Sequence, residues 1–436
     1  RGDFPMSPAI LTIIIFFLCI LSFIWEKIPL AVTCLLGGIA LALLGIIDYV
    51  DIYSNMGTQV VAIVIGTSMV GLGLESAGIS DMVGSALRRT GIAKNERLFI
   101  TIIVLVTALL SAFLSNSAVI AMFIPIIQGM SKKSQGIVKQ KHALLAAGLG
   151  SAAGGGLTLV GTAPIVTASS IVENSGLPGT RAFTFLEVGY SMLPVVILMA
   201  LYFATFGYNL QQRALADLPD NPLDALMSGE TEQASTAVPV WKKAVALAAA
   251  LFMVVGFAFN LFDIGAVSLM AAAIMLVCSV IPWKAALRDM DWNTVLVLAF
   301  SAALAAGLNE SGGGAMIAQG IVSLFGGADA NPAVLLFVCV AVGAVLTNFM
   351  GNAALVIAMI PISLEVALTC GANPMCFALA TTVSCMLAFS TPIGTACVTQ
   401  TLVGGYRYHD FVKIGLPINI LAILAVGLVS PIVYGL

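Results

Sequence analysis

The chain has 436 residues, of which 60% are hydrophobic and only 9% are charged, whereas soluble domains carry roughly one quarter charged residues. This composition excludes an ordinary soluble protein, and a net charge of −3 offers nothing to attract nucleic acid. Apolar runs long enough to cross a bilayer recur along the chain, so we expect an all-α polytopic membrane protein. Residues 1–5, which precede Met6, are interpreted as a cloning remnant.

The first half, residues 6–207, contains two kinds of apolar segment. The expected membrane spans are uninterrupted runs, at Ala9–Trp25, Ile28–Ile47, Thr58–Leu74 and Val188–Gly207. Residues 98–130 are also apolar but carry Asn116 near their middle, and a span needs only about 20 residues. We therefore predict a re-entrant helical hairpin there. Residues 142–172 are interrupted by Gly and Pro, which predicts a broken helix.

The second half, residues 240–436, repeats this order after a polar stretch at 208–239, which we interpret as a solvated cytoplasmic linker. The expected spans are Val240–Leu261, Gly265–Ile281, Thr294–Leu308 and Phe411–Tyr434. Residues 332–368 form the second predicted hairpin, and residues 376–403 form the second predicted broken helix.

The two hairpins share a sequence pattern. FLSNSAVIAMFIPI at Phe113–Ile126 aligns without a gap to FMGNAALVIAMIPI at Phe349–Ile362. Asn116 meets Asn352 in this alignment, an offset of 352 − 116 = 236 residues. Internal repeats that share a site near the bilayer midplane are typical of secondary transporters. We therefore expect the two hairpin tips to meet at one binding site.

The distribution of basic residues indicates how the repeats are oriented. If both hairpins are re-entrant, all of the 18 Lys and Arg residues except Arg1 and Arg181 fall on one side of the membrane. That side is then cytoplasmic by the positive-inside rule. The first half has an odd number of spans, so the second half is predicted to be inverted, as an inverted-topology repeat. In a bacterium the protein would lie in the inner (cytoplasmic) membrane.

Titratable groups are absent from both tips and both helix breaks. An intramembrane acid would be the default proton carrier, and the nearest acids, Glu75, Glu310 and Glu365, lie at predicted span ends, where solvation is expected. Neutral oxygens alone favour Na⁺ over H⁺ as the coupling ion. The chain has no G-x-x-x-x-G-K-[ST], H-E-x-x-H or G-x-S-x-G motif and no paired-cysteine spacing, so we expect neither an enzyme nor a cofactor.

At these residues the chain resembles the divalent anion/sodium symporter (DASS) family, within the ion transporter superfamily. That family carries a Ser-Asn-Thr motif at each tip and a Thr/Ser-Pro-Pro-like loop in each broken helix. The matching segments here are Ser115-Asn116-Ser117, Gly351-Asn352-Ala353, Gly161-Thr162-Ala163-Pro164 and Ser390-Thr391-Pro392-Ile393. At Ala353 the sequence departs from the pattern and lacks a hydroxyl that the family uses.

The resemblance implies an elevator-type symporter, usually a homodimer, that moves a small divalent anion with Na⁺. The first implied Na⁺ site comprises Ser111, Ser115, Asn116 and Gly161, and the second comprises Thr347, Met350, Asn352 and Ser390. The implied substrate contacts are Asn116, Ser117, Thr162, Asn352, Ala353, Thr391 and Pro392. A C4-dicarboxylate is the first candidate substrate, and sulfate or another oxyanion is the second.

Two alternatives remain open from the sequence. A proton-linked antiporter or arsenite-type permease of the same superfamily would need a titratable group at the midplane. A receptor or assembly protein without transport would not depend on Asn116 or Asn352.

Overall fold

The computed structural model describes residues 7–25, 27–79, 82, 86, 91–226, 238–259, 261–325 and 331–436. Every regular element in these ranges is a helix, which confirms the all-helical class. The expected cloning remnant, residues 1–5, and residues 227–237 of the predicted linker lie outside the described residues.

The elements of the first half follow the predicted order of spans, hairpin and broken helix. They are α1 (Pro8–Trp25), α2 (Leu30–Leu43), η1 (Tyr49–Ile52), η2 (Ser54–Gly57), α3 (Gln59–Ser76), η3 (Gly91–Lys94), α5 (Glu96–Ser111), α6 (Asn116–Lys133), α7 (Gln140–Gly154), α8 (Ala163–Glu173), α9 (Gly189–Ala204), α10 (Phe206–Ala214) and α11 (Leu223–Leu226). Residues 112–115 join α5 to α6, and residues 155–162 separate α7 from α8. The predicted hairpin and broken helix therefore each contain two helices.

The second half repeats this order. Its elements are α12 (Val240–Ala258), α13 (Ile264–Val277), α14 (Trp283–Asp289), α15 (Trp292–Glu310), α16 (Gly313–Leu324), α17 (Pro332–Leu346), α18 (Asn352–Thr369), α19 (Pro374–Ser384), α20 (Ala396–Gln400), η6 (Thr401–Gly404) and α21 (Tyr408–Tyr434). Residues 347–351 join α17 to α18, and residues 385–395 separate α19 from α20. The sequence did not predict the short helices α14 and α16.

Six helices in the described ranges are long and apolar enough to cross a membrane, namely α1, α3, α12, α15, α18 and α21. A seventh span results if α9 and α10 count as one, with a bend of 65°. The predicted spans around α2 and α13 are shorter than expected, at 14 residues each. Both helices end where the backbone turns left-handed, at Gly45 after α2 and at Ser279 after α13.

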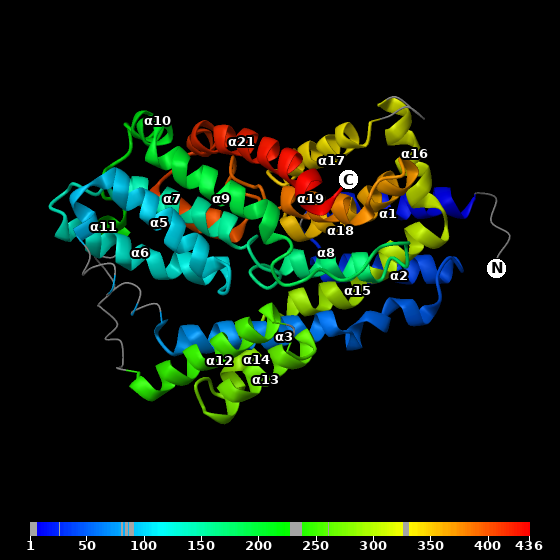
Figure 1. The fold of residues 1–436 in the computed structure, drawn as a ribbon, viewed down its shortest axis with the longest axis horizontal. Helices are drawn as coiled ribbons and strands as arrows, with labels where there is room; N and C mark the ends of the chain where they lie inside the picture. Colours follow the sequence, from blue (N-terminus) through cyan, green and yellow to red (C-terminus); the bar gives the residue numbers. More distant parts are fainter. Residues whose placement is uncertain are drawn as a thin grey trace.

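The helices can be divided into two groups, which stay in contact through α8 and α18. One, which we call the flanking group, contains α1–α3 and α12–α16. The other, which we call the tip group, contains α5–α11 and α17–α21 and includes both hairpin tips. In Figure 1 the helices α3, α12, α13 and α14 lie below, and α5, α7, α9 and α21 lie above. Contacts between the groups pass mainly through α8 and α18, which pack against α3, α15 and α16.

The first part of the predicted linker packs against the tip group at a few buried positions, while most of its side chains are exposed. Gln211 on α10 is fully buried, and its Nε2 donates a 2.8 Å hydrogen bond to the carbonyl oxygen of His142. The buried Lys141 ammonium donates to the carbonyl oxygen of Leu218 at 2.6 Å and pairs with Asp220 at 2.8 Å. A hydrogen bond from Lys141 lowers the pKa of Asp220.

Replacing Asp220 by Asn should destabilise this docking by about 1 kcal/mol, because the buried Lys141 ammonium loses its charged partner while Asp220 itself is half exposed. The lowered pKa of Asp220 means that the stabilisation is present above about pH 4 and is lost as the pH falls further. Thermal unfolding of D220N at neutral pH measures the effect. The exposed Asp217 provides the control, and equal losses in D217N and D220N would contradict the assignment.

Candidate functional site

The first hairpin tip holds Asn116 at the start of α6. Ser115 is the N-cap residue of this helix, and its hydroxyl accepts a hydrogen bond from the amide of Ala118 at 3.3 Å. The Ser111 hydroxyl donates to Asn116 Oδ1 at 2.5 Å and lies 3.0 Å from the Ser151 hydroxyl. Ser151, on α7, also donates to the carbonyl oxygen of Asn116 at 3.0 Å. The hairpin therefore holds the Asn116 side chain through Ser111, and the broken helix holds the Asn116 backbone through Ser151.

The second tip holds Asn352 in the same way, at the start of α18. The Thr347 hydroxyl lies 2.7 Å from the Asn352 side-chain amide and 2.6 Å from the carbonyl oxygen of Cys385. The same end of the amide lies 3.0 Å from the carbonyl oxygen of Gly394 and 3.2 Å from that of Cys385. With nitrogen at this end, the amide donates to both carbonyl oxygens. Three neutral oxygens, those of the Thr347 hydroxyl and of the Cys385 and Gly394 carbonyl groups, thus meet at this end of the amide.

Each helix break places a Gly-Thr-Ala triplet against a tip. Gly161-Thr162-Ala163 leads into α8, with Thr162 as the N-cap residue, and Gly394-Thr395-Ala396 leads into α20, with Thr395 as the N-cap residue. A Cβ atom on Gly161 would lie 3.1 Å from the carbonyl oxygen of Ser111, and one on Gly394 would lie 2.3 Å from that of Thr347. Only glycine permits this close approach of the backbone to the tip.

The counterpart of Gly161–Ala163 is therefore Gly394–Ala396, and not the Ser390-Thr391-Pro392 segment that the sequence comparison paired with it. Thr391 is buried and donates to the carbonyl oxygen of Asn348 at 2.5 Å. In the first half Thr158 makes the same bond, at 2.5 Å, to the carbonyl oxygen of Ala112. Thr158 and Thr391 thus fasten each helix break to its tip.

Ser390 and Pro392, on either side of Thr391, are also held by hydrogen bonds near the second tip. The Ser390 amide donates to Asn348 Oδ1 at 2.9 Å, and the carbonyl oxygen of Pro392 accepts a bond from the Thr399 hydroxyl. The Ser390 hydroxyl has no hydrogen-bond partner among the described residues. The sequence did contain a signal for the correct pairing, because the triplet Gly-Thr-Ala occurs at both places with an offset of 394 − 161 = 233 residues.

A cavity of about 480 Å³ lies between the tips and the flanking group. Of the residues predicted from the sequence, those that line it are Ser115, Asn116, Ser117, Gly161, Thr162, Asn352 and Ala353. Those that do not line it are Ser111, Thr347, Met350, Ser390, Thr391 and Pro392. Ser111, Thr347 and Met350 are buried behind the tips. The cavity also reaches Gly394, Thr395 and Ala396, which the sequence prediction missed.

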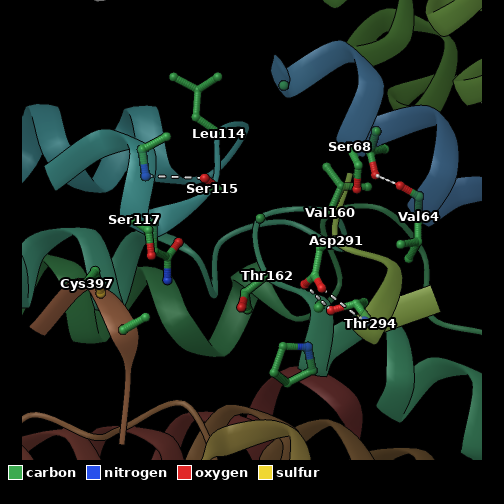
Figure 2. Close-up of a pocket in the computed structure, with 18 of the residues that line it drawn as sticks. Val64, Ser68, Leu114, Ser115, Ser117, Val160, Thr162, Asp291, Thr294 and Cys397 are labelled. Carbon is green, nitrogen blue, oxygen red and sulfur yellow. Dashed lines mark hydrogen bonds between the residues drawn. The ribbon is translucent and has the colours of Figure 1, made fainter. Parts of the chain in front are cut away.

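The wall opposite the tips comes from α3 and from the turn between α14 and α15. Figure 2 shows Ser115, Ser117 and Thr162 on one side, and Val64, Ser68, Asp291 and Thr294 on the other. Nothing in the sequence pattern placed this wall against the tips, because it depends on how the flanking group packs.

The two walls differ in electrostatic character. The first turns of α6, α8 and α18 line the tip side, and such turns present unpaired amide groups and the positive end of the helix dipole. The opposite wall carries Glu75, Asp289 and Asp291. Asp289 is paired with Arg288, and Asp291 caps α15 through Thr294. No Lys, Arg or His lines the described part of the cavity.

Among the described residues there is no cluster of three or more His, Cys, Asp or Glu side chains that would hold a metal ion. The oxygens at the tips are neutral amide, hydroxyl and carbonyl groups, a donor set for hard cations and not for zinc or copper.

The sequence model of the CitMHS family, described as citrate transporters, matches residues 20–382, most of the chain. The chain belongs to this family. It is therefore a transporter and an integral membrane protein, not an enzyme.

The curated relatives agree with the resemblance to DASS symporters. The sodium-dependent dicarboxylate transporter SdcS of Staphylococcus aureus is 22% identical over 453 residues, which cover 95% of this chain and 84% of SdcS. An uncharacterized transporter of Synechocystis, sll0640, is 28% identical over 226 residues, which cover 51% of this chain and 34% of that protein. The chain thus spans about a third of this relative's length. The resemblance to the DASS family is confirmed by these relatives.

A solved structure supports the fold. The MtrF protein of Neisseria gonorrhoeae, described as one of a class of antimetabolite efflux pumps, superposes with a TM-score of 0.62 at 12% identity. The match covers 99% of this chain and 96% of MtrF. At this identity the likeness concerns the fold alone.

Proposed function

We propose that this transporter is a Na⁺-coupled symporter of a small divalent anion, with a C4-dicarboxylate as the first candidate. The observation that carries the proposal is the convergence of three helix N-termini, those of α6, α8 and α18, on one cavity. Helix N-termini bind anions through free amide groups and the helix dipole. They give the anion a binding surface that needs no Lys or Arg.

The substrate would lie between the two tips. Asn116, Ser117 and Thr162 offer polar groups on one side, and Asn352 and Thr395 offer them on the other. A volume of about 480 Å³ accommodates a four- to six-carbon carboxylate. Sulfate would fill only a small part of it, so it is the weaker candidate. SdcS is named for dicarboxylates and the family for citrate, which supports carboxylates as the class.

Two Na⁺ ions would bind behind the tips, as part of the transported cargo. The first site would comprise Ser111, Ser115, Asn116 and Gly161, and the second Thr347, Met350, Asn352 and Gly394, with Gly394 replacing Ser390. The Thr347 hydroxyl and the carbonyl oxygens of Cys385 and Gly394, which meet at the Asn352 side chain, support the second site. All of these groups are uncharged, which fits a monovalent alkali ion.

Coupling would follow from the position of the two asparagines. Asn116 and Asn352 each line the cavity and each belong to a proposed cation site. A cation there would fix the amide and bring a positive charge close to the substrate carboxylate. At about 4 Å and an effective dielectric constant of about 20, such a pair attracts with roughly 4 kcal/mol. The anion would then bind well only after Na⁺.

For transport we infer an elevator mechanism in which the tip group moves as one body against the flanking group. The packing supports this division, because the contacts between the two groups run mainly through only two helices of the tip group, α8 and α18. The repeated order of elements supports two inverted repeats, and a homodimer is the expected assembly for the DASS resemblance.

One observation favours a second candidate, proton-linked transport. Glu75, an acid at the end of α3, lines the same cavity as the tips. Bound Na⁺ would be unnecessary if Glu75 carried a proton with the substrate.

A thermal-shift screen of the purified protein separates these candidates. We expect succinate, malate or citrate to raise the unfolding temperature in NaCl and to have no effect in choline chloride, because the anion lacks a counter-charge without Na⁺. Sulfate serves as the comparison for oxyanions. Stabilisation by an anion in choline chloride that grows as the pH falls would contradict Na⁺ coupling and favour Glu75.

A further inference from the structure

A polar cluster joins the tip group to the flanking group at the end of α8 that lies away from the cavity. Asn55, in η2, has a side chain that is only 1% exposed. Its Nδ2 donates to the Ser170 hydroxyl at 2.8 Å and to the carbonyl oxygen of Leu298 at 2.7 Å. Its Oδ1 accepts a hydrogen bond from Asn174 Nδ2 at 2.9 Å. One amide thus connects η2, α8 and α15.

A second bond crosses the same interface nearby. Asn309, near the end of α15, donates from Nδ2 to the carbonyl oxygen of Ser175 at 2.9 Å. Ser175 follows α8 directly after Asn174. Both bonds therefore hold the same end of the same helix.

The rest of this interface is apolar. Val166 on α8 packs into a small cluster of buried side chains from α3 and α15, formed by Val60, Val61, Val64, Val295 and Leu298. An apolar contact without directional bonds gives little preference for one position of α8 over a neighbouring one. The hydrogen bonds of Asn55 are directional and satisfy both of its donors.

The helix α8 links this cluster to the cavity. Its first residues, Ala163 and Pro164, line the cavity, and its other end carries Ser170 and is followed by Asn174. At 1.5 Å per residue, these ends lie about 17 Å apart. Because α8 is one continuous helix, a bond at its far end restrains the part that lines the cavity.

We propose that Asn55 is a conformational latch, which holds α8, and with it the tip group, in the position seen in this structure. The proposal rests on the elevator mechanism proposed above. Movement of the tip group would leave the buried Asn55 amide without Ser170 and Asn174. Since a buried polar group without a partner is unfavourable, the latched position gains population over the alternative.

Removal of the latch should shift the population towards the alternative position. We expect Asn55→Ala to lower the ratio of latched to unlatched protein roughly five- to tenfold, the effect of losing one or two buried hydrogen bonds. Ser170→Ala removes one of these bonds and should have a smaller effect. Ser22→Ala is the matched control, because the 2.9 Å bond between Ser22 and Thr33 lies within the flanking group.

Disulfide cross-linking across the interface measures the population. Val166→Cys and Val295→Cys place thiols at two packed positions, one in each group. A protease site inserted between residues 226 and 238 puts the two cysteines on separate fragments, so that only cross-linked protein stays intact after cleavage. The full chain without the added pair shows the background from its eight native cysteines.

The proposal predicts slower cross-linking in N55A, an intermediate rate in S170A and an unchanged rate in S22A. Equal rates in all variants, with the protein still monodisperse, would overturn the latch. Cross-linking does not depend on transport, so it tests the latch separately from the proposed Na⁺-coupled symport. If the parent protein shows no Na⁺-dependent thermal shift, the proposed function is wrong. If the cross-linking rate in N55A equals that of the parent protein, only the latch is wrong.

Discussion

Replacing Asn352 by Ala should lower Na⁺-dependent uptake at least about 100-fold while the protein still folds. The amide of Asn352 is surrounded by the Thr347 hydroxyl and by the carbonyl oxygens of Cys385 and Gly394. Its loss would remove a ligand of the proposed second cation site and a group that lines the cavity. Hydrogen bonds to charged partners contribute about 1.5–3 kcal/mol each, and 2.7 kcal/mol corresponds to a factor of about 100.

Uptake of radiolabelled succinate into proteoliposomes, driven by a Na⁺ gradient, measures this effect. Asn373→Ala is the matched control, because Asn373 caps α19 outside the cavity by accepting a bond from the amide of Met375 at 3.0 Å. We expect N373A to lose about 1 kcal/mol of stability and to keep its uptake. Normal uptake in N352A would show that the second tip does not form part of the transport site.

The tips were predictable because their residues follow one another in the chain. Asn116 and Asn352 each begin a helix directly after a short turn, and the same apolar pattern follows both. An alignment of the chain with itself is therefore sufficient to find them. The expected role of their neighbours Ser117 and Ala353 in lining the cavity agrees with the structure, although binding itself stays a prediction.

The broken helices were harder to align, because the spacing between hairpin and break differs between the halves. The offset is 236 residues for the tips but 233 for Gly161 and Gly394. The proline in Ser390-Thr391-Pro392 resembles the family pattern. The sequence comparison therefore paired this segment with Gly161-Thr162-Ala163. Thr391, however, fastens the break to the tip as Thr158 does. The packing of backbone against backbone identifies the correct pair, which the repeated Gly-Thr-Ala triplet also marks in the sequence.

The wall opposite the tips was not predictable from local pattern. Glu75 and Asp291 lie more than 200 residues apart in the chain, and only the packing of the flanking group brings them to one cavity. The docking of residues 208–226 was not predictable for the same reason. Their composition is polar, and only specific hydrogen bonds to the tip group hold them in place.

Replacing Gly394 by Ala should weaken the response of the protein to Na⁺ about tenfold or more. A Cβ atom here would lie 2.3 Å from the carbonyl oxygen of Thr347 and 2.4 Å from the Cβ atom of Ala388, closer than atoms can approach. The backbone must therefore shift by an appreciable fraction of an ångström, at an overpacking cost of about 1–3 kcal/mol. Since Thr347 and Gly394 both belong to the proposed second cation site, the shift should raise the half-saturating Na⁺ concentration about tenfold or more.

The measurement is the Na⁺ dependence of thermal stabilisation and of uptake in G394A. Gly320→Ala is the control, because a Cβ atom on this exposed glycine of α16 meets nothing within 4 Å and alanine favours the helix. Gly161→Ala tests the first site in the same way, since its Cβ atom would lie 2.5 Å from the carbonyl oxygen of Gly155. If G394A folds and keeps the Na⁺ half-saturation of the parent protein, the cation does not bind at the second tip. The convergence of oxygens around Asn352 would then be structural, and the anion would depend on the helix N-termini alone.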